Sequence, residues 1–143
     1  MGMLDVAIAS IEAKEKNRAV AAEEFTRKQA ILSELGPRLW AKFRAVLKSE
    51  CEKRHQYFTF RVGQILCAEV VCRNRRALQM EYLAASQRIA FRIMAEDADD
   101  FIGTYRIGLD DNEVAAIFEA GGMILPSATY VAEELLTLLL SSS

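Results

Sequence analysis

Between residues 57 and 120, apolar and polar residues alternate in short runs. Residues typical of turns separate these runs. In the first run, Phe58 and Phe60 alternate with Thr59 and Arg61. A period of two is typical of strands that bury one face and leave the other in water. Because neighbouring parallel strands need long crossover connections, about six such runs joined by short turns predict an antiparallel meander.

Helical patterns flank this predicted sheet. Residues 3–34 contain no Gly or Pro and are rich in Ala, Glu, Lys and Arg, which favours a helix. Gly36 and Pro37 then form a strong stop signal. We therefore expect a long N-terminal helix within residues 1–36 and a second helix over residues 37–56.

A third helical pattern lies near the end of the sequence. Ser127 follows Pro126 and is suited to cap a helix over residues 127–140. Together these elements predict a two-layer α+β fold: N-terminal helices, then an antiparallel meander of about six strands, then a C-terminal helix packed on one face of the sheet. We expect residues 1–143 to form a single domain, with the sheet over residues 57–120.

The predicted N-terminal helix carries apolar residues at alternating spacings of four and three. They are Leu4, Ile8, Ile11, Ala22, Phe25 and Leu32, and the polar residues Glu15, Arg18 and Gln29 interrupt the rhythm. A helix of about 30 residues is about 45 Å long, which exceeds the width of a small globular body. Two alternatives follow: the helix breaks near residues 14–18, or one end projects with Leu4, Ile8 and Ile11 exposed. Exposed apolar residues would need a partner, so these three form the predicted oligomer interface.

The net charge of −2 conceals an uneven distribution. Residues 1–36 carry a net charge of −1, residues 37–94 carry +8 and residues 95–143 carry −9. In one interpretation the opposite charges neutralise one another within the fold or between subunits. In the other, the basic half forms a face that meets an anionic partner.

Arginine recurs at the polar positions of the predicted strands. If the apolar residues point to the core, these arginines point to the open face of the sheet: Arg61, Arg88, Arg92 and Arg106. Two interpretations stay open, an ordinary solvated face or a docking surface for a carboxylate, a phosphate or an acidic peptide. Nucleic acid is not expected, because Tyr57 is the only aromatic residue on this face and the isoelectric point is near 5.5.

Residues suited to metal binding and catalysis are sparse. Cys51 and His55 are four apart on one helix face, but Cys67 and Cys72 are five apart in a strand and so point to opposite faces. We therefore expect no metal site and no cofactor. With one histidine, no phosphate-binding glycine loop and no nucleophile elbow, an enzyme is the less favoured interpretation, and we name no catalytic residue.

The remaining signals concern the cellular setting. No run approaches the ~18 consecutive apolar residues of a membrane span, and the start of the sequence lacks the layout of a secretory signal. Three cysteines are not a disulfide framework, so we expect a cytoplasmic protein without a membrane partner. The expected function is a non-enzymatic protein-interaction or binding domain that binds itself or another protein. The alternative is an enzyme or a binder of a small anionic molecule, which uses the Arg-lined sheet face or a cavity between helices and sheet.

Overall fold

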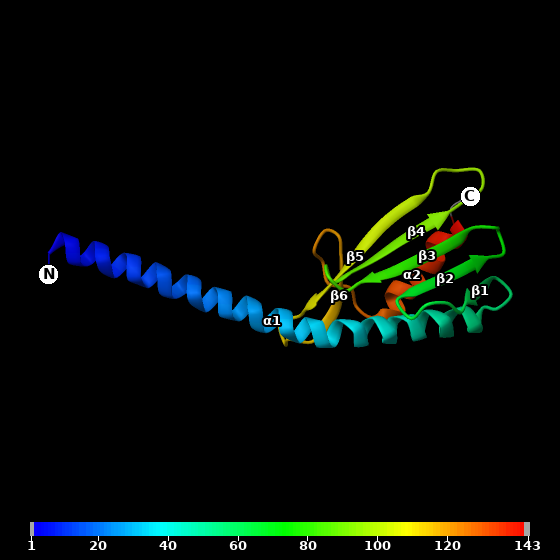
Figure 1. Cartoon of the computed structure of the whole chain (residues 1–143). Coiled ribbons are helices and arrows are strands. Elements are labelled where there is room, and N and C mark those ends of the chain that lie inside the picture. The colour runs from blue at the N-terminus through cyan, green and yellow to red at the C-terminus, as the bar shows by residue number, and fades with distance from the viewer. Residues whose placement is uncertain (1, 142–143) are drawn as a thin grey trace. The chain divides into compact units, whose positions relative to one another are not determined.

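The computed structural model describes residues 2–141, which form two helices and six strands (Figure 1). The helices are α1 (Met3–Lys53) and α2 (Ala128–Ser141). The strands are β1 (Phe58–Arg61), β2 (Cys67–Cys72), β3 (Ala77–Leu83), β4 (Arg88–Met94), β5 (Phe101–Leu109) and β6 (Ala115–Glu119). The chain divides into two compact units, Met1–Ile31 and Leu32–Ser143.

Helix α1 is continuous where the sequence predicts an end. The predicted stop at Gly36 and Pro37 is wrong, because the helix runs through both residues to Lys53. A Cβ atom at position 36 would lie 2.7 Å from the Tyr82 hydroxyl and would also collide with the side-chain oxygen of Gln87. The glycine therefore allows the helix to pack closely on the turn between β3 and β4. It does not end the helix.

Pro37 lies inside α1 and weakens the helix locally. Proline has no N–H group, so one hydrogen bond of the α1 ladder is missing and the helix is weakened there. The next turns of α1 bury Trp40, Phe43 and Leu47 against the sheet, and this packing outweighs the local signal. The helix is also continuous through residues 14–18, where one of the two sequence alternatives places a break.

The six strands form one sheet in the order β1-β2-β3-β4-β5-β6. Every neighbouring pair is antiparallel, so the predicted meander is confirmed. The register aligns residues of successive strands into rows that cross the sheet. These rows decide which side chains meet on its open face.

The other face of the sheet packs against the helices and forms the core. In β3, for example, Leu78, Met80 and Tyr82 are buried and alternate with exposed residues. The indole ring of Trp40 stacks on Tyr82, with ring centroids 6.0 Å apart. Its N–H group donates to the Ile65 carbonyl oxygen at 2.8 Å, which fastens the connection between β1 and β2 to α1.

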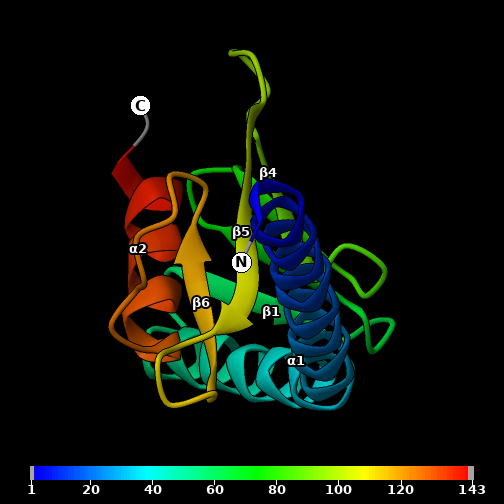
Figure 2. The same ribbon diagram turned by 90° about the vertical axis from the view of Figure 1, so that its left-hand side faces the viewer.

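Helix α2 packs on the same core through Val131, Ala132, Leu135, Leu136 and Leu139. The Ser127 hydroxyl oxygen accepts a hydrogen bond from the Tyr130 backbone N–H at 3.1 Å, so the predicted helix cap is confirmed. The Asn74 side-chain amide donates to the Leu139 carbonyl oxygen at 2.9 Å and fixes the other end of the helix. Figure 1 shows α2 behind the strands, and Figure 2 shows it as a separate layer beside them. The predicted α+β fold is confirmed.

Candidate functional site

The first unit is a stretch of helix α1 whose own surface carries large apolar side chains. Every residue from 2 to 30 is exposed, including Leu4, Ile8 and Ile11. Leu4 is 72% exposed and Phe25 is 66% exposed, although both are large and apolar. Within the helix, Glu24 pairs with Arg27 at 3.2 Å and with Lys28 at 3.7 Å, and such pairs support helix formation on a polar face.

Because α1 is continuous, residues spaced by four and three along it share one face. We call this face the seam and define it as positions 4, 8, 11, 15, 18, 22, 25 and 29. The stripe continues beyond the seam to Leu32 and Phe43, which are buried in the core of the second unit. The same stripe is therefore covered from Leu32 onward and uncovered before it.

The four predicted arginines lie on the open face of the sheet and are exposed. The strand neighbours of Arg88, Arg92 and Arg106 are buried, and Phe60 beside Arg61 is half-buried. The register separates them into two rows. Arg61 and Arg92 belong to one row, with Glu69 and Gln79 between them. Arg88 of β4 lies directly opposite Arg106 of β5 in another row. Two like charges directly opposite each other are destabilising, so the charges of Arg88 and Arg106 do not stabilise the sheet.

Three of the four arginines have partners within the chain. Arg61 pairs with Glu69 at 3.4 Å between Nη1 and Oε1, and Arg92 pairs with Asp100 at 3.7 Å between Nε and Oδ2. The guanidinium carbon of Arg106 lies 4.5 Å from the centre of the Phe118 ring, in a cation–π contact. These contacts occupy groups that an anionic partner would need.

An open groove of about 630 Å³ lies on this face of the sheet. Arg61 and Arg92 line it, and so do the carboxylates of Glu69 and Glu81. The charges in the groove therefore balance. Its apolar lining includes Ile102, which is exposed on β5. A small anion in the groove would compete with Glu69 for Arg61 and with Asp100 for Arg92.

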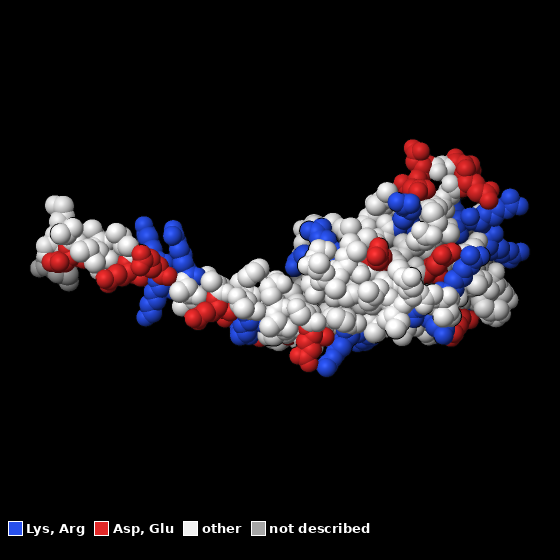
Figure 3. Space-filling model, viewed as in Figure 1, with Lys and Arg blue, Asp and Glu red and all other residues white. Residues whose placement is uncertain are grey.

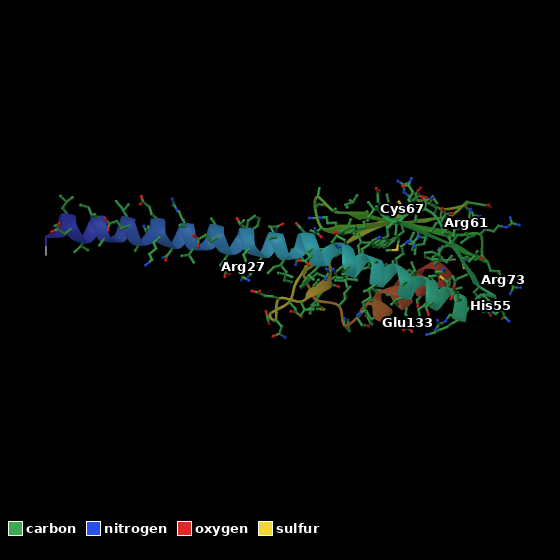
Figure 4. The ribbon with its side chains drawn as sticks, turned by 60° about the horizontal axis from the view of Figure 1, so that its bottom comes forward. Arg27, His55, Arg61, Cys67, Arg73 and Glu133 are labelled. Atoms are coloured by element: carbon green, nitrogen blue, oxygen red, sulfur yellow. The ribbon has the colours of Figure 1, made fainter. Side chains whose placement is uncertain are left out.

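Opposite charges also meet at one end of the sheet. Figure 3 shows Asp and Glu gathered over the β4–β5 loop, close to Lys and Arg at the turn between β2 and β3. Arg75 in that turn lies 3.9 Å from Glu96 in the loop. Figure 4 shows Arg73, which follows β2, at the same end of the sheet. These contacts support the interpretation that the basic and acidic segments neutralise each other within the fold.

The cysteines are placed for packing. Cys67 and Cys72 lie on opposite faces of β2, as the strand spacing predicts. Cys51 is buried in α1, and burial raises the pKa of its thiol to about 12, so it carries no thiolate at neutral pH. His55 follows the end of α1 and is exposed. Among residues 2–141, no group of three or more His, Cys, Asp or Glu is arranged to hold a metal ion.

The sequence interpretation missed one charged residue of structural importance, Glu50. Its side chain is buried near the end of α1, where it accepts a hydrogen bond from Arg54 at 2.6 Å and from Lys53 at 3.1 Å. The hydrogen bonds from Arg54 and then Lys53 lower the pKa of the Glu50 carboxyl. The spacing of Glu50 to its two basic neighbours was a visible signal, but the burial of the carboxylate was not.

Two further findings bear on function. Within the part of the chain that the structure describes, neither helix combines the length and the apolar composition that a bilayer span requires. No protein-family model matches the chain, and no curated protein or solved structure matches it. The function must therefore be inferred from the side chains themselves.

Proposed function

We propose that the protein is a non-enzymatic interaction module that associates with a second copy of itself through the seam of α1. The observation that carries the proposal is the change along one helix stripe, which is exposed over the seam and buried from Leu32 onward. Because the stripe keeps the same apolar spacing on both sides of Leu32, each half can be buried against a different partner. The sheet covers the second half, and a partner helix would cover the first.

The energetics of helix formation favour burial of the seam against a partner. An isolated helix gains little from propensity alone, and most helices in proteins are stabilised by burial of one face. The ion pairs of Glu24 contribute only about 0.3–0.5 kcal/mol each, because they are exposed. Full burial of one large apolar side chain such as Ile8 contributes about 1.5–3 kcal/mol. Pairing two seams would therefore stabilise this helix more than its own side-chain pairs do.

The solution mass of the full chain tests the proposal. Size exclusion with light scattering, at low and at high salt, should give a mass near twice 16.0 kDa. The mass should not fall at high salt, because salt screens charge pairs far more than apolar contacts. A monomer at every concentration would refute the proposal. A dimer that dissociates at high salt would instead indicate pairing of the oppositely charged segments between subunits.

The groove on the open face supports a second candidate function, the binding of a small anionic molecule. Arg61 and Arg92 both line the groove, and a planar guanidinium group suits carboxylates and phosphates. Binding to the native state would raise the melting temperature of the chain. Inorganic phosphate is the probe, and simultaneous charge reversal by Arg61→Glu and Arg92→Glu should remove any such shift, because these two arginines line the groove. An unchanged melting temperature in phosphate would remove this candidate.

A further inference from the structure

The polar residues of the seam have a symmetry that its apolar residues alone do not reveal. The seam runs from Leu4 to Gln29, so its midpoint lies between residues 16 and 17. Glu15 and Arg18 flank this midpoint at equal distances, and they carry opposite charges. Both side chains are exposed on the face that the seam defines. A polar pair at such positions specifies how two helices align, at a cost in stability.

Two copies of this helix can align in parallel or antiparallel. In a parallel pair in register, each residue meets its own copy, so Glu15 would meet Glu15 and Arg18 would meet Arg18. Like charges on facing positions are destabilising. In an antiparallel pair about a two-fold axis at the midpoint, Glu15 of one copy meets Arg18 of the other, and this contact occurs twice. The charges of the seam therefore oppose one orientation and favour the other.

We propose that two copies of the chain pair through their seams in antiparallel orientation, about a two-fold axis between residues 16 and 17. The inference rests on the proposed function, because it names the orientation and the register of that self-association. Around the two Glu15–Arg18 contacts, Ile11 of each copy faces Ala22 of the other, and Ile8 faces Phe25. Such a contact is isologous, so it closes as a dimer and does not continue into a filament.

The sizes of the residues next to the central contacts agree with this register. The small Ala22 faces the branched Ile11, and large and small residues on facing positions fill a helix interface without voids. A shift of the partner by seven residues in one direction places Glu15 against Ile11. The opposite shift places Glu15 against Phe25. Either shift leaves a carboxylate on an apolar side chain, which costs free energy.

The positions beside the seam do not oppose this alignment. Next to the central contacts, Glu12 of one copy lies beside Ala19 of the other. On the opposite flank, Lys14 lies beside Ala21. No like charges come together on either side, and the alanines allow the two backbones to approach closely.

Charge reversal tests the register. Glu15→Arg makes both central contacts like-charged in the antiparallel pair, and so does Arg18→Glu, so each should raise the dissociation constant roughly tenfold or more. The double variant Glu15→Arg with Arg18→Glu restores both contacts and should bind as tightly as the unchanged chain. Glu23→Arg is the matched control, because Glu23 is exposed on α1 but lies outside the seam. Equal dissociation constants for all variants would overturn the inference.

Distances between spin labels test the orientation in the full chain. Labels on Met3→Cys and on Asn17→Cys are introduced in a Cys67→Ser background, because Cys51 and Cys72 are buried. In the antiparallel dimer, residue 3 lies about 27 residues from its copy, which is about 40 Å at 1.5 Å per residue. Residue 17 lies beside its copy across the axis, within about 20 Å.

The outcomes separate the inference from the proposed function. A long distance at residue 3 together with a short distance at residue 17 supports the antiparallel pair. Short distances at both positions would overturn the orientation and leave the self-association intact. The absence of a distance between copies at either position, together with a monomeric mass, would overturn the proposed function as well.

Discussion

A lysine at position 11 should weaken the dimer, and the size of the effect follows from the exposure of Ile11. Full burial of an isoleucine side chain contributes about 1.5–3 kcal/mol, and 57% of this side chain is exposed in the single chain. Its burial by a partner is therefore worth about 1 kcal/mol. A two-fold dimer buries Ile11 twice, so Ile11→Lys removes about 2 kcal/mol, or about 30-fold in the dissociation constant.

The matched control is Val6→Lys. Val6 is also 57% exposed on the same helix, but it lies opposite the seam. Sedimentation velocity over a dilution series of each full-length variant gives the dissociation constants. The fluorescence of Trp40, the only tryptophan, reports whether the core of the second unit stays folded. The reasoning would be refuted if both variants weakened the dimer equally, or if Ile11→Lys left it unchanged.

Three further predictions concern the second unit. Because the pKa of Glu50 is lowered in the folded state, its carboxylate stabilises the fold at pH values above its unfolded pKa of 4.5, and this stability is lost as the pH falls through the folded pKa. The free energy of unfolding of Glu50→Gln in urea should therefore depend less on acid pH than that of the unchanged chain. An equal dependence would contradict this. Gly36→Ala should lower the free energy of unfolding by about 1–3 kcal/mol, because the added methyl group meets the Tyr82 hydroxyl. An unchanged denaturant midpoint would contradict this, because it would mean that the β3–β4 turn moves aside at no cost. At neutral pH a disulfide reagent should modify Cys67 in the folded chain and Cys51 only on unfolding; rapid modification of Cys51 would contradict its burial.

Much of the sheet could be predicted from the sequence, because alternation of apolar and polar residues is a local signal with a direct geometric meaning. The buried positions Ile89, Phe91 and Ile93 and the exposed Arg88 and Arg92 follow from this period. The cap at the start of α2 was equally local. Such features need no knowledge of distant residues.

The errors arose where a distant contact overrides a local preference. Gly36 and Pro37 are typical of a helix end, yet the helix continues, because Gly36 packs against the β3–β4 turn and the following residues are buried under the sheet. The arginines were placed on the correct face, but the partners of Arg61 and Arg92 depend on strand register and loop path. Neither is visible in the spacing of residues along the sequence.

Amide hydrogen exchange of the full chain, at concentrations below and above its dissociation constant, tests the seam most directly. We predict that residues 4–29 gain protection as the concentration rises, while residues 32–141 do not change. Exchange reports the stability of each helical turn, so it locates the contact as well as detecting it. Unchanged exchange over residues 4–29, or new protection confined to the strands that carry Arg61 and Arg92, would contradict self-association through α1.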